Sequence, residues 1–263
     1  MISSNAKIIQ KSFTEQARNF ETKSMNFTKQ EYLVDMVSCI DPQKSDIALE
    51  VAAGTCICGR FLAPFVKNVT CLDMTTAMLA AGKDEAKRQG LLNMDFVQGD
   101  AGRLPFSDNS FDIVISRLAF HHFPNPKCCF SEMARVLKTG GKLVAIDMEA
   151  AEEALRNTEN EIETLRDPSH VRKLSKEEFT EMFRKNCLSI MTLECTELPV
   201  SLSAWLNLTN TPAEICADIS KRLTDEMKGN GLTGFHSYQK DGEIYFHQRW
   251  LMMIGKKEGN YYQ

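Results

Sequence analysis

Three acidic side chains follow short apolar segments of this chain and could serve a bound nucleoside. Glu50 ends the run ALE, Asp73 ends NVTCLD, and Asp100 follows MDFVQG. Asp73 lies nineteen residues after Gly54, a spacing at which an acid can accept hydrogen bonds from both hydroxyls of a ribose. An acid at Asp100 can accept a hydrogen bond from the amino group of adenine. Each signal is weak alone, but together the three segment ends predict a nucleoside site.

Two adjacent histidines form the second candidate group for chemistry. His121 and His122 lie in SRLAFHHFPNP, directly after an apolar segment. Histidine titrates near neutral pH, so either residue can accept or donate a proton, and we take both as candidate catalytic residues. The alternative is that one of them only forms a hydrogen bond that holds the loop.

Cysteines near these residues raise the question of a metal or redox site. Cys56 and Cys58 occur in GTCICG, and Cys128 and Cys129 are adjacent. Zinc sites typically use two cysteines separated by two to four residues, and neither pair has that spacing. Cysteine also behaves as a small apolar residue in protein cores. We therefore expect both pairs to be packing residues and expect no metal site.

The elements that must position these residues alternate between strands and helices. Short apolar runs predict five strands, and helical periodicity predicts helices between them. The expected strands are 46–51, 68–73, 94–100, 111–116 and 142–148. The expected helices are 75–90 and 125–141, after two N-terminal helices at 7–21 and 30–40. This alternation predicts an α/β fold with a parallel sheet and helices on both faces, which binds ligands at the carboxyl ends of its strands.

The rest of the chain predicts a second, looser unit. Residues 149–166 form a strongly acidic helix whose charged side chains we expect to face solvent. Further expected elements are a strand at 188–198, a helix at 211–229 and a last strand at 242–257. We therefore divide a single domain into an N-terminal helical lid (1–45), a cofactor-binding core (46–148) and a substrate-covering segment with the final strands (149–263).

Composition narrows the class of partner. The net charge is -4 and the pI is about 5.8, which argues against a nucleic-acid substrate. The sequence contains no apolar run long enough for a membrane span and no signal-peptide pattern at its start. Nine cysteines without an export signal favour reduced thiols, hence a cytoplasmic protein.

Several motifs resemble those of class I S-adenosylmethionine-dependent methyltransferases. The chain is most similar to the small bacterial type related to ubiquinone and menaquinone methyltransferases, over about residues 46–148. The most specific motifs are LPFSDNSFDIV, HHFPNP and RVLKTGGKL. The resemblance implies a Rossmann-like, seven-stranded, mostly parallel sheet whose last strand is antiparallel, and S-adenosyl-L-methionine as cofactor.

The resemblance also implies roles for individual residues. Asp73 would hold the ribose of the cofactor, Asp100 and Ala101 would border the adenine, and Arg117 would flank the methionine part. The implied cofactor-binding residues are Glu50, Val51, Ala52, Gly54, Cys56, Asp73, Met74, Asp100, Ala101 and Arg117. The candidate substrate contacts are Phe13, Phe120, His170 and Arg172. For His170 and Arg172 the alternative is a local salt bridge to Asp167.

One departure from the family pattern keeps two interpretations open. The family turn carries three glycines, and here Ala52 and Cys56 occupy two of these positions while Gly54 remains. The added Cys56 side chain is expected near the main-chain contacts of the cofactor. Cofactor binding either persists with a slightly different turn, or it is weakened or lost.

The sequence therefore favours methyl transfer to a small-molecule acceptor at a carbon, oxygen, nitrogen or sulfur atom. The alternative is a non-catalytic binding or regulatory protein with a degenerate cofactor turn. A nucleotide-dependent oxidoreductase matches less well, because GTCICG is a poor dinucleotide fingerprint. A homodimer is compatible with all three hypotheses.

Overall fold

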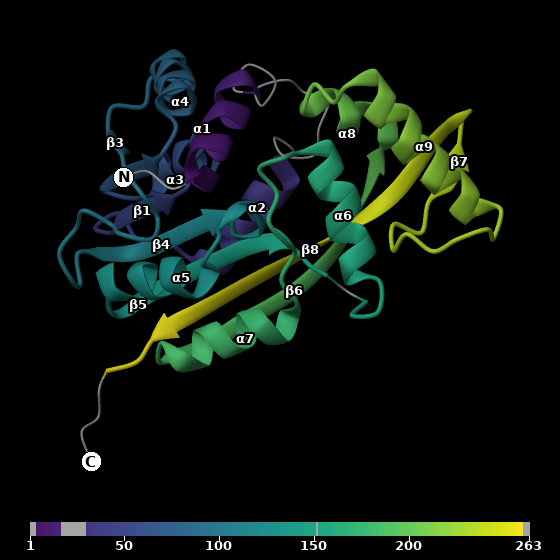
Figure 1. The fold of residues 1–263 in the computed structure, drawn as a ribbon. Helices are drawn as coiled ribbons and strands as arrows, with labels where there is room; N and C mark the ends of the chain where they lie inside the picture. The colour runs from purple at the N-terminus through teal and green to yellow at the C-terminus, as the bar shows by residue number, and fades with distance from the viewer. Residues whose placement is uncertain (1–3, 17–29, 151, 260–263) are drawn as a thin grey trace.

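A computed structural model describes residues 4–16, 30–150 and 152–259 of the chain. Its centre is one eight-stranded sheet with the order β3-β2-β1-β4-β5-β8-β6, to which β7 adds by pairing with β8 (Figure 1). The strands are β1 (Ile47–Val51), β2 (Asn68–Asp73), β3 (Met94–Gln98), β4 (Phe111–Arg117), β5 (Leu137–Met148), β6 (Leu188–Ser201), β7 (Tyr238–Lys240) and β8 (Glu243–Lys257). The predicted mixed fold is confirmed.

The prediction of seven strands is wrong by one strand. The additional strand is β7, three residues that pair antiparallel with the start of β8. Asp241 and Gly242 connect the two strands and both have positive φ, 51° and 80°. Two such residues form the tight turn that suits the twist of a hairpin, so the chain reverses here in two residues.

The first five strands are parallel, and β8 runs antiparallel to both β5 and β6. This agrees with the predicted mostly parallel sheet with an antiparallel final strand. Because the five parallel strands point the same way, their carboxyl ends meet along one edge of the sheet. The acids predicted for a ligand site lie along this edge.

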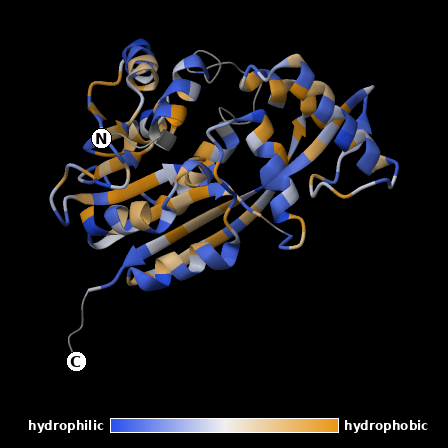
Figure 2. Ribbon diagram, viewed as in Figure 1, coloured by the Kyte–Doolittle hydropathy of each residue, from blue (hydrophilic) through white to orange (hydrophobic). Residues whose placement is uncertain are grey.

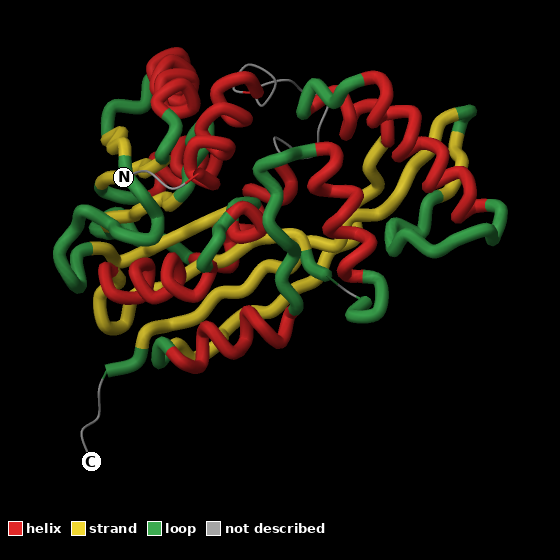
Figure 3. Tube along the Cα trace, viewed as in Figure 1, coloured by secondary structure: helices red, strands yellow, loops and turns green. Residues whose placement is uncertain are grey.

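Helices cover both faces of the sheet, as the sequence predicts (Figure 3). On one face α5 and α7 supply Phe130 and Phe183 to a core with the strands. On the other face α2 and α3 supply Met36 and Leu62 to a second core. The helices are α1 (Ser4–Gln16), α2 (Gln30–Ile40), α3 (Ile57–Leu62), α4 (Thr76–Arg88), α5 (Pro126–Val136), α6 (Arg156–Arg166), α7 (Lys176–Lys185), α8 (Leu202–Leu208) and α9 (Ala213–Met227). Two 3₁₀ turns, η2 (Ala63–Phe65) and η3 (Phe120–His122), complete the described elements.

The long strands β6 and β8 extend beyond the end of β5 and carry a third core. The β5 pairing ends at Met148 with Trp250, whereas β6 continues to pair with β8 as far as Ser201 and Tyr245. Trp205 of α8 packs there against aromatic and aliphatic side chains from α6, α9 and the strands. Hydrophobic and hydrophilic residues are interspersed along these helices (Figure 2). This extension places α6 and α8 beside the carboxyl edge of the parallel strands.

The acidic segment before α7 differs from its prediction. The helix begins at Arg156 instead of residue 149, and its charged residues are not all solvated. Glu159, Glu163 and Arg166 have only 5, 0 and 7% of their surfaces exposed. The solvated face was the wrong interpretation, because oppositely charged side chains from other parts of the fold pair with this face.

The N-terminal residues agree with prediction in part. The helix α2 has the predicted bounds, and α1 covers residues 4–16 of the chain, whereas residues 17–21 of the predicted helix lie outside the described residues. No helix within the described residues is long and apolar enough to cross a membrane.

Candidate active site

A cavity of about 230 Å³ opens at the carboxyl edge of the parallel strands. Its walls come from the tips of the first five strands, from α1, and from α6, α8 and β8. The predicted site residues that line it are Phe13, Glu50, Ala52, Gly54, Asp73, Met74, Asp100, Ala101, Arg117, His121 and His122. The fold thus brings together residues that lie more than a hundred positions apart in the sequence.

Asp73 links the turn after β1 to the turn after β2. Its Oδ2 accepts a hydrogen bond from the Gly54 N–H at 2.8 Å, and its Oδ1 accepts one from the Thr75 N–H at 2.7 Å. The carboxyl group is 8% exposed, and burial raises its pKa in spite of these two donors. Each oxygen of a carboxylate has a further lone-pair direction, so Asp73 can accept additional hydrogen bonds at the cavity wall.

The two glycine replacements in the turn after β1 both adopt left-handed backbone conformations. Ala52 has φ of 52° and Cys56 has φ of 61°, values that favour glycine. The Cys56 side chain is fully buried, and its Sγ lies 2.8 Å from where a Cβ on Gly82 of α4 would stand. Cys56 therefore points into the core beneath the turn and does not line the cavity. Its Sγ remains 3.7 Å from the main-chain oxygen of Gly54, so the expectation that the side chain lies near the main-chain contacts of the cofactor stays a prediction.

Glu50 holds the start of α3. Its Oε2 accepts a hydrogen bond from the Gly59 N–H at 2.7 Å, and its Oε1 accepts one from the Cys58 N–H at 3.3 Å. Burial raises the pKa of Glu50 to about 7, although these donors lower it in part. A Cβ on Gly59 would come within 2.8 Å of Glu50 Oε2 and 2.6 Å of Cys71 Sγ. Position 59 therefore requires glycine, because Glu50 and Cys71 approach its main chain too closely for a side chain. The sequence alone did not indicate this role.

The remaining cofactor candidates divide into lining and supporting residues. Asp100 accepts a hydrogen bond from the Gly102 N–H at 2.8 Å and borders the cavity with Ala101. The guanidinium of Arg117 lies 5.1 Å from the centre of the Trp250 ring. Val51 is fully buried in β1 and does not line the cavity.

His121 forms a close pair with an acid that the sequence analysis did not single out. Its Nδ1 lies 2.5 Å from Oδ1 of Asp147, and both side chains are buried. Asp147 is itself fixed by the N–H groups of Phe120 and Met148, at 2.6 and 2.7 Å. Since a carboxylate only accepts, His121 donates a hydrogen bond from Nδ1 to Asp147, which leaves Nε2 as the ring nitrogen outside this pair. No described residue bonds to that Nε2, and His121 lines the cavity.

The signal for Asp147 was present in the sequence. It ends the apolar run KLVAID, so it lies at the carboxyl edge of the fifth strand, next to the loop that carries the histidines. The same argument that selected Asp73 and Asp100 applies to it.

His122 lies beside His121 and is kept uncharged. Its Nδ1 lies 3.0 Å from the main-chain oxygen of Ser169, and its ring contacts Phe13 of α1 edge-on at 4.9 Å. Burial and the neighbouring His121 lower its pKa to about 4. A neutral His122 does not repel a proton on the adjacent ring, whose centre is 4.1 Å away.

Three predicted substrate contacts lie outside the cavity lining. Phe120 is buried in the core against Phe123 and Phe179. His170 Nε2 lies 2.9 Å from Asn160 Oδ1, and burial lowers its pKa to about 2. Arg172 forms an ion pair with Glu178 at 2.8 Å. His170 and Arg172 have these partners in place of the expected alternative, a salt bridge to Asp167, and their contact with a substrate stays a prediction.

Three of the four cysteines in the two predicted pairs are core residues. Cys56, Cys58 and Cys129 are buried, and burial raises the pKa of each thiol; for Cys129 the value is about 12. Within the part of the chain that the structure describes, no three His, Cys, Asp or Glu side chains are placed to hold a metal ion. The predicted packing role fits Cys56, Cys58 and Cys129, whereas Cys128 is exposed and does not have that role.

Comparison with known proteins identifies the family. The methyltransferase domain family matches residues 49–145. The methyltransferase YcgJ of Bacillus subtilis is 32% identical over 203 residues, 77% of this chain and 80% of YcgJ. The chain belongs to the methyltransferase family. The crystal structure of YcgJ superposes with a TM-score of 0.80 and 30% identity over 88% of this chain and all of YcgJ.

Two further relatives extend this result. The demethylmenaquinone methyltransferase of Renibacterium salmoninarum is 38% identical over 115 residues, 44% of this chain and 45% of that protein. The phosphoethanolamine N-methyltransferase 2 of Haemonchus contortus, in complex with S-adenosyl-L-methionine, has a TM-score of 0.65 at 16% identity, over 98% of this chain and 61% of that one. The latter shares the fold alone. This methyltransferase is an enzyme, as its motifs predict.

Proposed function

We propose that this methyltransferase methylates a small-molecule acceptor whose proton is taken by His121. The observation that carries the proposal is the 2.5 Å contact between Nδ1 of His121, a residue that lines the cavity, and Oδ1 of Asp147. A carboxylate in this position fixes the imidazole tautomer and stabilises the imidazolium that forms. Asp147 is therefore a positioning residue for His121.

Residues on the first three strand tips fit the cofactor. Asp73 has lone pairs left for ribose hydroxyls, and Gly54 presents its main chain at the cavity wall with open space where a side chain would stand. Asp100 and Ala101 border the position for adenine, while Glu50 and Arg117 border the position for the methionine part. When bound, S-adenosylmethionine supplies an electrophilic methyl group on a positively charged sulfur. The thiol of Cys56 is buried and does not obstruct the cavity wall that these residues form.

The opposite end of the cavity fits a partly apolar acceptor. Phe123, Met148, Trp205 and Leu208 line it together with the two histidines. A cavity of this size takes a small molecule, and the net charge of -4 supports this over a nucleic acid. The family match with demethylmenaquinone methyltransferases supports an aromatic acceptor class.

The chain contributes alignment and a proton acceptor to the reaction. Methyl transfer is a displacement, so holding the acceptor atom in line contributes most of the rate. The acceptor's proton goes to His121 Nε2 as the new bond forms, and Asp147 stabilises the resulting charge. His122 orients the loop by its contact with Ser169.

Substitution of the pair tests the proposal. Acceptor screens with labelled S-adenosylmethionine and hydroxylated, amino and thiol arenes would identify a working acceptor. We expect His121→Gln to lower kcat by roughly 10²–10⁴-fold while the affinity for S-adenosylhomocysteine stays the same. Asp147→Asn should lower kcat and change its pH profile. The exposed His236 provides the control, and His236→Gln should behave as the wild type. Wild-type turnover in His121→Gln would contradict the proposed base.

A further inference from the structure

The end of the cavity formed by α6, α8 and β8 contains polar donors that neither the cofactor nor the proposed base uses. Arg166, Trp205 and Gln248 line this end, and all three are more than nine-tenths buried. They lie outside residues 49–145, the part that matches the methyltransferase domain family. Recognition by these residues is therefore a property of this chain's second half.

Arg166 carries a buried charge with unused hydrogen-bond donors. It is 7% exposed, and a guanidinium keeps its charge in proteins and offers five N–H donors. Its Nη2 lies 3.2 Å from Glu163, and its Nη1 donates to the Trp205 main-chain oxygen at 3.4 Å. Its Nε has no hydrogen-bond partner among the described residues. A buried donor left unpaired is costly, so a ligand that accepts from this group is favoured.

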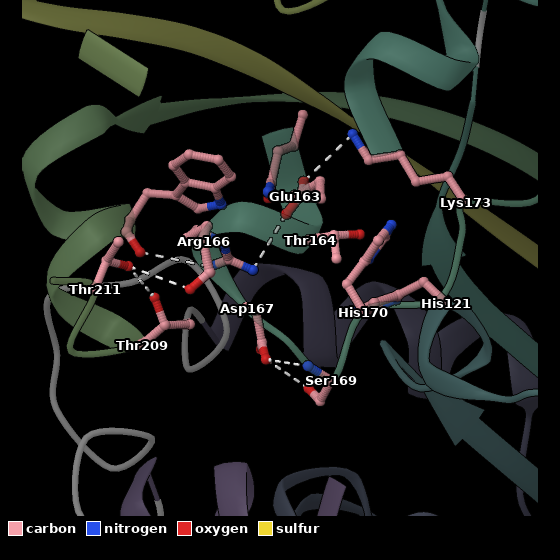
Figure 4. A network of polar contacts seen from close by, with 12 residues as sticks. His121, Glu163, Thr164, Arg166, Asp167, Ser169, His170, Lys173, Thr209 and Thr211 are labelled. Carbon is pink, nitrogen blue, oxygen red and sulfur yellow. Dashed lines mark hydrogen bonds and ion pairs between the residues drawn. The ribbon is translucent and has the colours of Figure 1, made fainter. Parts of the chain in front are cut away.

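The surrounding charges hold Arg166 in place without saturating it (Figure 4). Glu163 is fully buried and also pairs with Lys173 at 3.4 Å, which pairs with Glu159 at 3.0 Å. Neither oxygen of Glu163 has a hydrogen bond of good geometry within the described chain. Glu163 therefore holds Arg166 in position by charge attraction. It does not form a bidentate hydrogen-bonded pair with the guanidinium. The Trp205 ring, 4.4 Å from Arg166 Cζ, supports the opposite face.

Gln248 and Trp205 add donors of the same kind. The Trp250 indole N–H donates to Gln248 Oε1 at 3.3 Å, and because an indole can only donate, this contact fixes the amide orientation. The amide nitrogen of Gln248 bonds to no residue in the described ranges, and Gln248 lines the cavity. The Trp205 Nε1 is likewise buried without a partner in the described part of the chain.

We infer that the acceptor carries a carboxylate, which Arg166 binds together with the amide of Gln248. A guanidinium matches the planar, two-oxygen geometry of a carboxylate better than a point charge does. The Trp205 ring beside the guanidinium and the apolar Leu208, which also lines the cavity, favour an aromatic or otherwise flat body for the acceptor. This inference rests on the proposed function and names the substrate class of the same site.

Benzoate and benzamide provide a matched pair of probes. They have nearly the same shape and differ in charge, so their affinities isolate the carboxylate. Binding to the full-length protein is measured by calorimetry or ligand-observed NMR, with and without saturating S-adenosylhomocysteine. We expect benzoate to bind at least about tenfold more tightly than benzamide, as a charge-assisted contact implies.

The main variant removes both members of the buried ion pair at once. Glu163→Gln combined with Arg166→Met leaves no unpaired charge, because Lys173 keeps its bond to Glu159. We expect the preference for benzoate to disappear, whereas Gln248→Leu should weaken benzoate binding by a smaller factor. Arg184→Gln is the matched control, because the Arg184 side chain is 70% exposed on α7. This variant should bind benzoate as tightly as the wild-type protein does.

The outcomes separate the inference from the proposed function. Equal affinity for benzoate and benzamide, the absence of benzoate binding, or an unchanged preference in the double variant would overturn the carboxylate assignment. S-adenosylhomocysteine binding in each variant reports on the fold and on the cofactor half of the site. If that binding is absent in the wild type, the proposed function fails, while the benzoate comparison without cofactor still tests Arg166.

Discussion

At the scale of single residues, Asp73 is the group on which cofactor binding most depends. Its two oxygens accept the Gly54 and Thr75 N–H groups and so join two turns of the cavity wall. In our proposal the same oxygens accept the ribose hydroxyls. The residue therefore both shapes the site and contacts the ligand.

Replacing this acid should weaken cofactor binding strongly. Asp73→Ala removes two charge-assisted hydrogen bonds to the ribose, each about 1.5–3 kcal/mol, so we expect the Kd for S-adenosylhomocysteine to rise by at least 100-fold. Calorimetric titration measures this. The exposed Asp84 on α4 provides the control, and Asp84→Ala should leave the Kd unchanged. An unchanged Kd in Asp73→Ala would exclude the ribose assignment.

The sequence predicts many cavity residues but misses those that depend on distant partners. Asp73, Asp100 and His121 follow from their positions at strand ends, and all three line the cavity. Arg166 has no such signal, because its burial depends on Glu163, Lys173 and Trp205, which come from three separate segments. A charged helix without its partners is indistinguishable from a solvated one.

At the scale of elements, helical and strand periodicity locates most of the fold. The predicted β2 and α2 have the observed bounds, because an uninterrupted apolar pattern defines them. β5 begins at Leu137, five residues before its predicted start, in a stretch that was predicted to end a helix. The short helix α3 was not predicted, since it begins after the left-handed Cys56 and depends on Glu50 to bond its first N–H groups.

The helix α1 connects the two halves of the cavity wall. Its Gln10 donates to the Met74 main-chain oxygen at 3.0 Å, next to the proposed ribose site. Its Ser12 donates to Asp167 at 3.1 Å, at the acceptor end, and Gln16 donates to Ser12 at 2.7 Å. The role of the N-terminal segment as a lid stays a prediction, and these bonds of α1 are where it can be tested.

Loosening these bonds should speed the release of the cofactor product. We expect the double variant Ser12→Ala with Gln16→Ala to raise the dissociation rate of S-adenosylhomocysteine about fivefold or more, because bonds to the charged Asp167 are lost. Stopped-flow fluorescence measures the rate. Thr14 bonds only within α1 and is exposed, so Thr14→Ala is the control. Equal rates in all three proteins would argue against a lid.

At the scale of the whole molecule, the site lies where the carboxyl edge of the parallel strands meets the extension formed by β6 and β8. The parallel strands supply the proposed cofactor half, and the extended β6 and β8 carry the helices of the acceptor half. Several ionisable side chains are buried where these two parts of the fold meet. The stability of the molecule should therefore depend on pH through these groups.

His122 and His170 set the direction of that dependence. Their pKa values in the folded protein are about 4 and about 2, mainly because burial disfavours the charged form. In the unfolded chain each titrates near pH 6.5, so below that pH the unfolded state binds more protons. Each histidine therefore lowers the free energy of unfolding as the pH falls from 6.5 toward its folded pKa. Glu50 acts in the opposite sense between pH 7 and 4.5, because its folded pKa is raised to about 7.

Removing one histidine should flatten the loss of stability in mild acid. A histidine that is charged in the unfolded chain and neutral in the folded protein contributes about 1.4 kcal/mol per pH unit to the slope of the free energy of unfolding against pH. His170 lies outside the cavity lining, so its replacement tests burial without altering the proposed chemistry. We expect urea unfolding of His170→Gln between pH 6 and 5 to show a slope smaller by about this amount than that of the wild type. His236→Gln, at a 62% exposed side chain, should retain the wild-type slope. Equal slopes for His170→Gln and the wild type would mean that His170 is protonated in the folded protein, and the buried network around Glu163 would then hold one more positive charge.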